Sequence, residues 1–213
     1  MTVYNDQVSQ YITRIFAGED EALQLAREDS LRLGLPGISI KPEEGRFLQF
    51  LVRACGVRLA LELGTLGGYS GIWIARGLLP GGRLISIDKD LKHADVARAH
   101  FAAAGLDDRV EVRVGEAGAL LPLLSHEGPF DFVFIDADKP GYPLYFEWAV
   151  ENTRPGGVIA AHNAFRRGSV TGQAPEDEFT PIMRAFNARL ASDQRLISTI
   201  YPAGDGTLLS VKI

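Results

Sequence analysis

Short apolar runs alternate with segments of helical periodicity along most of this sequence, and this alternation restricts the fold more than any other feature. Strands are predicted at residues 59–63, 83–88, 110–114, 130–135 and 158–161. Helices are predicted between them at residues 70–76, 92–104, 117–124 and 142–153. Strands that alternate with helices pair in parallel through right-handed crossovers, so we expect an open α/β sheet with helices on both faces.

The segment 195–213 departs from this alternation. It contains two predicted strands, 196–201 and 207–212, separated by the turn-forming sequence PAGDG. A hairpin requires one of its strands to run antiparallel to the rest of the sheet. Seven mostly parallel strands with such a hairpin are similar to the Rossmann-like sheet of class I methyltransferases. The chain of 213 residues is expected to form one domain, 1–213, with residues 1–40 as a helical N-terminal cap.

Composition limits the classes of partner and compartment. The formal net charge is -5, which argues against binding to nucleic acid, because phosphate binding normally depends on clustered Lys and Arg. Cys55 is the single cysteine, so no intramolecular disulfide can form and a reducing compartment is expected. The longest apolar runs have the length of strands and are too short for a membrane span. We therefore expect a cytoplasmic protein that does not bind membranes.

A glycine-rich turn follows the first predicted strand in the sequence LALELGTLGGYSGIW. Gly64, Gly67 and Gly68 do not have the dinucleotide-binding spacing, and no Gly-Lys-Ser/Thr for a phosphate loop follows them. Glu62 is poorly suited to a triphosphate but suits the cationic groups of S-adenosylmethionine. Asp88 ends the next strand, where a carboxylate accepts hydrogen bonds from ribose hydroxyls. The alternative is a structural turn with a solvated Asp88.

Five further segments resemble one known family: LELGTLGGYS, ISIDKD, VRVGEAGALLP, FDFVFIDADKPGY and FNARLASDQRLISTIYPAGDGTLLSVK. They are similar to the cation-dependent O-methyltransferases, which include catechol and caffeoyl-CoA O-methyltransferases. The resemblance covers the chain from Ile38 onward, and IDADKPxxY is its most specific part. It implies methyl transfer from S-adenosylmethionine to a hydroxyl of a small aromatic acceptor with vicinal oxygens.

The resemblance also implies roles for individual residues. Cofactor contacts are expected at Ser39, Ile40, Glu62, Gly64, Thr65, Gly68, Ser70, Asp88, Glu116, Ala117, Asp136 and Tyr142. Lys139, three residues after Asp136, is expected to be the general base that removes the proton of the acceptor hydroxyl. Asp136 is expected to face both the cofactor and a divalent cation that binds the acceptor oxygens.

The predicted metal site contains one departure from the family. In the sequence GGVIAAHNAF, His162 stands where the family has a second Asp, followed by the expected Asn163. We predict that Asp136, His162 and Asn163 bind a divalent cation, and that the imidazole favours Mn²⁺, Fe²⁺, Co²⁺, Ni²⁺ or Zn²⁺ over Mg²⁺. Protonation of His162 should then reduce activity near and below a pH of about 6.5. Alternatively, the site needs no metal, and His162 is the base or makes only a hydrogen bond.

The sequence is also compatible with other functions and partners. The pair Arg166 and Arg167 begins a polar loop, 165–179, that suits either a mobile lid over the acceptor or a solvated loop. The pair also leaves open methylation of a hydroxylated uridine in tRNA, as some similar proteins do. A protein that binds the cofactor but has lost turnover is a further alternative.

Two further predictions concern the surface: an apolar face of the N-terminal segment and two histidines. The N-terminal segment is amphipathic and suggests a homodimer or lid contact through Val8, Tyr11, Ile12, Ile15 and Phe16. His93 and His100 lie seven residues apart on one predicted helix and are expected to face solvent.

Overall fold

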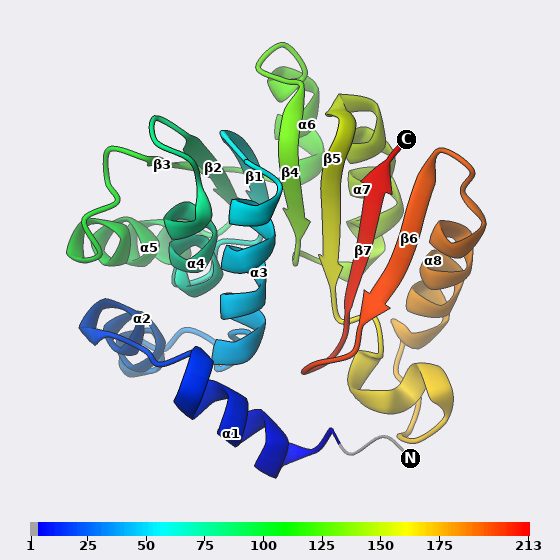
Figure 1. Ribbon diagram of the computed structural model, residues 1–213, viewed down its shortest axis with the longest axis horizontal. Coiled ribbons are helices and arrows are strands. Elements are labelled where there is room, and N and C mark those ends of the chain that lie inside the picture. The colour runs from blue at the N-terminus through cyan, green and yellow to red at the C-terminus, as the bar shows by residue number, and fades with distance from the viewer. Residues whose placement is uncertain (1–3) are drawn as a thin grey trace.

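The computed structural model describes residues 4–213 and contains a seven-stranded sheet (Figure 1). Its strands are β1 (Leu59–Leu63), β2 (Arg83–Asp88), β3 (Val110–Val114), β4 (Phe130–Ile135), β5 (Thr153–His162), β6 (Leu196–Tyr201) and β7 (Thr207–Lys212). They lie in the order β3-β2-β1-β4-β5-β7-β6. Strands β1 to β5 pair in parallel, and β7 runs antiparallel to both β5 and β6. The predicted α/β fold with a C-terminal hairpin is confirmed.

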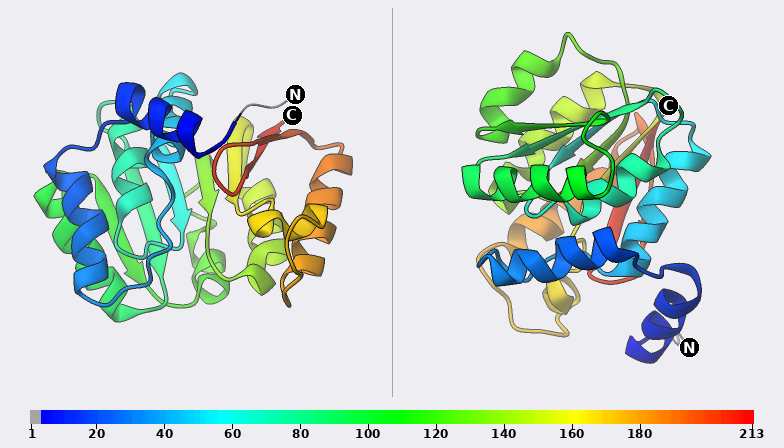
Figure 2. Two further views of the ribbon diagram at one scale, coloured as in Figure 1. Left: turned by 90° about the horizontal axis from the view of Figure 1, so that it is seen from below. Right: turned by 90° about the vertical axis from the view of Figure 1, so that its left-hand side faces the viewer.

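Helices cover both faces of the sheet (Figures 1 and 2). One face carries α3 (Pro42–Ala54), α4 (Tyr69–Gly77) and α5 (Leu91–Ala103), and the other carries α6 (Ala117–Leu124), α7 (Tyr142–Asn152) and α8 (Thr180–Ser192). Each face has its own buried apolar cluster, because successive side chains of a strand point to opposite sides. In β1, Leu61 and Leu63 pack toward α6–α8, whereas Ala60 packs toward α3–α5.

The N-terminal helices lie below the carboxyl ends of the parallel strands in Figure 1. Helix α1 spans Asp6–Phe16 and α2 spans Glu21–Arg32, and each begins after a capping side chain, Asn5 or Asp20. Of the predicted cap over 1–40, these two segments are helical, 33–40 is not, and 1–3 lie outside the described residues. This placement brings the cap next to the edge of the sheet where ligands bind in α/β folds.

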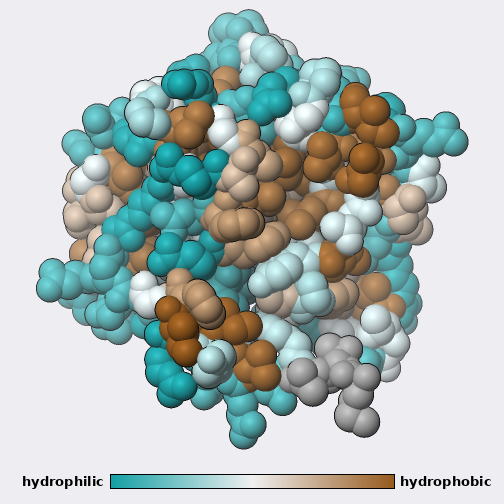
Figure 3. All heavy atoms as spheres, in the orientation of Figure 1, coloured by the Kyte–Doolittle hydropathy of each residue, from teal (hydrophilic) through white to brown (hydrophobic). Residues whose placement is uncertain are grey.

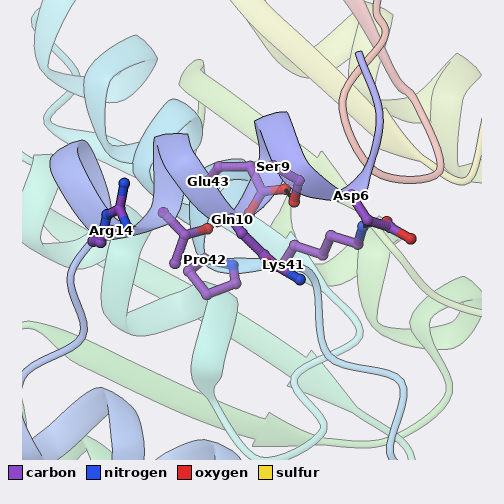
Figure 4. Close-up of a pocket in the computed structure, with 8 residues that line it drawn as sticks. Asp6, Ser9, Gln10, Arg14, Lys41, Pro42 and Glu43 are labelled. Carbon is purple, nitrogen blue, oxygen red and sulfur yellow. Dashed lines mark hydrogen bonds and ion pairs between the residues drawn. The ribbon is translucent and has the colours of Figure 1, made fainter. Parts of the chain in front are cut away.

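A small cavity of about 420 Å³ lies where α1 meets the start of α3 (Figure 4). The buried carboxylate of Glu43 accepts hydrogen bonds there from the hydroxyls of Tyr4, Ser9 and Thr13. Burial raises the pKa of Glu43, but these bonds outweigh it and lower the pKa overall. With its hydrogen bonds satisfied inside the protein, Glu43 joins α1 to α3.

Three elements contain more helix or strand than the sequence predicts: β5, α3 and α8. Strand β5 begins at Thr153 rather than at 158, because the Pro and Gly residues of 155–157 lie in a bulge: Phe130 pairs with Thr153, but Phe132 pairs with Val158. Helices α3 and α8 were not predicted as separate elements. Helix α8 buries apolar side chains three and four residues apart, which is the periodicity of a helix on a sheet.

The outer part of the sheet is less covered. Among residues 4–213, no helix lies in front of β6 and β7 in the view of Figure 1. Ile197 and Val211 pair on that face and are 70% and 38% exposed, and Figure 3 shows apolar surface in this region. Within the same described residues, no helix has both the length and the apolar character that crossing a membrane requires.

Candidate active site

A cavity of about 700 Å³ lies at the carboxyl ends of the parallel strands. The turns after β1 to β5 contribute to its wall, as expected for a ligand site in an open α/β sheet. Most predicted site residues line it: Ser39, Ile40, Gly64, Thr65, Ser70, Asp88, Glu116, Ala117, Asp136, Lys139, His162 and Asn163. Glu62, Gly68 and Tyr142, which were predicted to contact the cofactor, are buried and do not line the cavity.

Asp88 ends β2 and is fixed by backbone donors. Its two carboxylate oxygens accept hydrogen bonds from the N–H groups of Leu66, at 2.8 Å, and Asp90, at 3.0 Å. His93 Nδ1 lies 3.3 Å from Asp88 Oδ1, and His93 lines the cavity. The prediction that His93 and His100 face solvent is therefore wrong. His100 is 2% exposed and its Nδ1 lies 2.7 Å from the carbonyl oxygen of Gly67, because α2 covers this part of α5.

Glu62 is separated from the cavity by a serine. It is fully buried, and its two oxygens accept hydrogen bonds from the hydroxyls of Ser70 and Ser86, each at 2.6 Å. Burial is the main cause that raises the pKa of Glu62 to about 7. Glu62 thus orients Ser70, which lines the cavity. Glu62 itself does not line the cavity.

Lys139 is buried at the end of β4 and has three hydrogen-bond acceptors. Its Nζ donates to Asp136 Oδ1 at 3.3 Å, to the carbonyl oxygen of Ala137 at 3.0 Å and to the hydroxyl of Tyr142 at 2.7 Å. The Tyr142 hydroxyl in turn lies 3.2 Å from the carbonyl oxygens of Ile135 and His162. Tyr142 therefore lies behind the cavity wall and fixes the lysine between the ends of β4 and β5.

His162 lies between two carboxylates. Its Nε2 is 2.9 Å from Glu44 Oε1, and its Nδ1 is 3.3 Å from Asp136 Oδ2. Burial lowers the pKa of His162, but the charges of Asp136 and Glu44 outweigh burial and raise it to about 10. Burial raises the pKa of Asp136, and His162 and Lys139 outweigh it and lower the pKa overall. Glu44, the carboxylate that orients the imidazole, was not predicted from the sequence.

Glu44 comes from the first turn of α3, far from His162 in sequence. Its second oxygen accepts a hydrogen bond from the backbone N–H of Lys41 at 2.9 Å, which begins the helix. Glu44 stands at the third helical position, but Lys41 is not a typical capping residue, so no capping signature marks the start of this helix in the sequence. Gly204, at φ +57°, packs directly on Glu44, since a Cβ there would lie 2.2 Å from its Cδ.

We predict that Glu44→Gln lowers the pKa of His162 by at least about one pH unit, because one of two neighbouring negative charges is removed. The amide oxygen of glutamine can still accept the hydrogen bond from Nε2, so the ring should keep its position. An NMR titration of the imidazole resonances measures the change.

Glu43→Gln is the matched control, because Glu43 is buried in the same turn but bonds to Tyr4, Ser9 and Thr13. It should leave the pKa of His162 unchanged. An equal pKa in the Glu44→Gln variant and the wild type would contradict the role assigned to Glu44.

The side chains of Asp136, His162 and Asn163 fit a divalent cation in their chemistry. His162 Nδ1 is buried without a hydrogen bond and points toward Asp136 Oδ2. Asn163 Nδ2 donates to Asp205 Oδ2 at 2.9 Å, so its amide oxygen is the atom suited to a cation. Within residues 4–213, no group of three or more His, Cys, Asp or Glu side chains is arranged to bind a metal ion. Asp136, His162 and Asn163 would instead offer a cation one carboxylate, one imidazole and one amide.

Comparisons with known proteins agree with this geometry. The sequence profile described as O-methyltransferase matches residues 13–213. A catechol O-methyltransferase of Niastella koreensis is 44% identical over 197 residues, covering 92% of this chain and 89% of that protein. One of Mycobacterium tuberculosis is 43% identical over 179 residues, covering 84% and 81%.

A solved structure shows the same likeness. The O-methyltransferase of Bacillus cereus, in complex with SAH, superimposes with a TM-score of 0.90 at 40% identity and covers 97% of both chains. Sequence, fold and arrangement of the cavity thus lead to one conclusion: the chain belongs to the O-methyltransferase family.

Proposed function

We propose that this protein transfers a methyl group from S-adenosylmethionine to a hydroxyl of a small aromatic acceptor with vicinal oxygens. The observation that carries the proposal is the hydrogen-bonded group of Lys139, Asp136 and His162 at one end of a cavity that reaches Asp88 at the other. Two relatives that share 43–44% of their aligned residues with this chain are named catechol O-methyltransferases, which supports the acceptor class.

The proposed cofactor-binding part is formed by the turns after β1, β2 and β3. Asp88 accepts hydrogen bonds from the ribose, Ser70 contacts the amino-acid part, and Glu116 and Ala117 flank the adenine. The Bacillus cereus protein in complex with SAH supports this cofactor. The fixed carboxylate of Asp88 needs no rearrangement to accept further donors, because its backbone bonds leave lone pairs on both oxygens.

We predict that Asp88→Ala weakens the binding of SAH by about 1.5–3 kcal/mol, the contribution of hydrogen bonds to a charged group. Asp88→Asn, which keeps an oxygen of similar geometry, should lose less affinity for SAH than Asp88→Ala. Isothermal titration calorimetry measures both affinities. Unchanged affinity in the alanine variant would exclude Asp88 from the ribose site.

The residues of the cavity perform the reaction mainly by positioning and proton removal. S-adenosylmethionine supplies a methyl group made electrophilic by its sulfonium. Lys139 removes the proton of the acceptor hydroxyl, and Asp136 and Tyr142 fix the amine in the place where that hydroxyl binds. Holding both partners in line can lower the barrier by about 7–11 kcal/mol.

We further propose that Asp136, His162 and Asn163 bind a divalent cation. Such a cation would polarise the acceptor hydroxyl and make it more acidic. Glu44 supports this assignment, because a carboxylate on the far nitrogen of a metal-binding imidazole is a common outer contact. The imidazole favours Mn²⁺, Fe²⁺, Co²⁺, Ni²⁺ or Zn²⁺ over Mg²⁺.

The experiment that tests the proposed function compares two kinds of acceptor. Labelled methyl transfer is measured with a panel of dihydroxylated aromatics, with and without a chelator, and with tRNA that contains hydroxyuridine. Transfer to the aromatics is expected. Transfer to tRNA alone would favour the nucleic-acid alternative, and cofactor binding without any transfer would favour a protein that has lost turnover.

We also propose that the protein forms a homodimer. Tyr11, Ile15 and Phe16 of α1 are between 50% and 64% exposed, so these apolar side chains are not packed against the core of their own chain. These side chains support an apolar contact with a second copy.

A further inference from the structure

We propose that the acceptor carries an anionic group, such as a carboxylate, in addition to its vicinal hydroxyls, and that Arg166 and Arg167 bind this group. The inference rests on the proposed function and adds the substrate class. Both arginines line the same cavity as Lys139 and Asn163, and both lie in the segment that begins four residues after the end of β5. Acceptor oxygens at Lys139 would therefore place a substituent of the ring within the part of the cavity that the arginines line.

The backbone that presents the two arginines is strained and firmly held. Asn163, Arg166 and Arg167 have φ angles of +64°, +47° and +53°, a region that residues other than glycine rarely adopt. Strain of this kind persists only where the surrounding structure imposes it, and it is concentrated at functional sites. Here Asp205 imposes it, since its carboxylate accepts hydrogen bonds from Asn163 Nδ2 and from the backbone N–H of Arg167, at 2.9 and 2.5 Å.

The same turn is held by backbone contacts from the β6–β7 hairpin. The N–H groups of Ala164 and Phe165 donate to the carbonyl oxygens of Gly206 and Asp205, at 3.0 and 2.9 Å. Gly206 packs against the ring of Phe165 so closely that a Cβ would lie 2.8 Å from it. The loop that the sequence left open between a mobile lid and a solvated loop thus begins with a turn held by hydrogen bonds, which fixes the backbone of Arg166 and Arg167.

Neither guanidinium is saturated by its neighbours. Arg166 pairs with Asp177 at 2.6 Å and lies over the ring of Phe179, 5.1 Å from its centroid, yet its Nε is buried without a hydrogen bond. Arg167 is exposed, and among residues 4–213 no carboxylate forms an ion pair with its guanidinium. A buried donor without a partner costs free energy, and a ligand that accepts its hydrogen bond removes this cost.

The carboxylates at this end of the cavity are already engaged. Asp136 contacts Lys139 and His162, Glu44 contacts His162, and Asp205 accepts the two hydrogen bonds of the turn. None of them pairs with the guanidinium of Arg167, which is therefore left for a ligand. Guanidinium groups recognise carboxylates through paired, charge-assisted hydrogen bonds, and Phe179 adds an apolar surface for a flat ring.

The test measures kcat/KM for protocatechuate and for its methyl ester, which has the same vicinal hydroxyls without the negative charge. We expect the wild type to prefer the acid. Arg167→Gln should lower the ratio of the two kcat/KM values by about 10- to 100-fold, mainly through a higher KM for the acid. Arg53→Gln, which removes the charge of an exposed arginine on α3, is the matched control and should keep the wild-type ratio.

Reversal of the charge makes the test sharper. Arg167→Glu should shift the preference from protocatechuate toward dopamine, a catechol that carries an ammonium group. Calorimetry with SAH checks that each variant still folds and binds the cofactor product. A ratio that is the same in the wild type and in both Arg167 variants would overturn the inference, even if all three acceptors are methylated. Failure to methylate any of the acceptors would instead count against the proposed function.

Discussion

Replacing Lys139 with alanine is expected to lower kcat by about 10²- to 10⁴-fold, the usual cost of losing a general base. The affinity for S-adenosylmethionine should change little, because the cofactor contacts proposed above come from other turns. The buried lysine is the amine fixed by Asp136 and Tyr142 at the acceptor end of the cavity. Steady-state kinetics with a catechol, together with calorimetry for the cofactor, separate the two effects.

Lys92→Ala is the matched control, since Lys92 is an exposed lysine on α5 that does not line the cavity. It should keep normal turnover. Normal turnover in Lys139→Ala would show that another group removes the proton, with His162 as the first candidate, or that the acceptor binds already ionised.

The second large expected effect is a dependence of metal affinity on pH, caused by the proton of His162. The raised pKa of His162 means that, without metal, the imidazole keeps its proton through neutral pH. A cation that binds Nδ1 must displace this proton, so its apparent affinity should rise about tenfold for each pH unit up to a pH of about 10. The sequence alone placed the loss of activity near and below a pH of about 6.5. The two carboxylates beside His162 raise its pKa, so the loss of activity is expected at higher pH.

Titration with Co²⁺, followed by its visible absorption at several pH values, measures this dependence without an activity assay. His162→Asp should remove the dependence above neutral pH and shift the preference toward Mg²⁺, because a hard anionic oxygen replaces the imidazole. Preference for Mg²⁺ in the wild type, or full activity in excess chelator, would contradict the proposed metal site. In the second case His162 becomes the candidate base.

Much of the fold was predictable because local patterns and long-range packing agree. The predicted strands over 59–63, 83–88 and 130–135 match β1, β2 and β4 in both bounds, since each is an apolar run between clear turn signals. The start of β5 was missed because Pro and Gly within 155–157 usually end a strand, and only the pairing with β4 shows the bulge. Such pairing is a tertiary property that no local pattern reports.

The site was predictable where a residue ends a strand or follows directly after it. Asp88, Asp136 and His162 lie at the cavity for this reason. Glu44 and Asp205 were missed because they reach the site from a helix start and a hairpin turn, and their partners are distant in sequence. Glu62, which was predicted to contact the cofactor, lies in the buried layer behind Ser70.

The most direct test of the central claim is product analysis after incubation with methyl-labelled S-adenosylmethionine and protocatechuate. One hydroxyl of the acceptor should gain the labelled methyl group, and an equimolar amount of SAH should form. Lys139→Ala should form the same product far more slowly. Cofactor binding without any methylated phenol, for protocatechuate and for the uncharged catechols alike, would contradict the proposed O-methyl transfer.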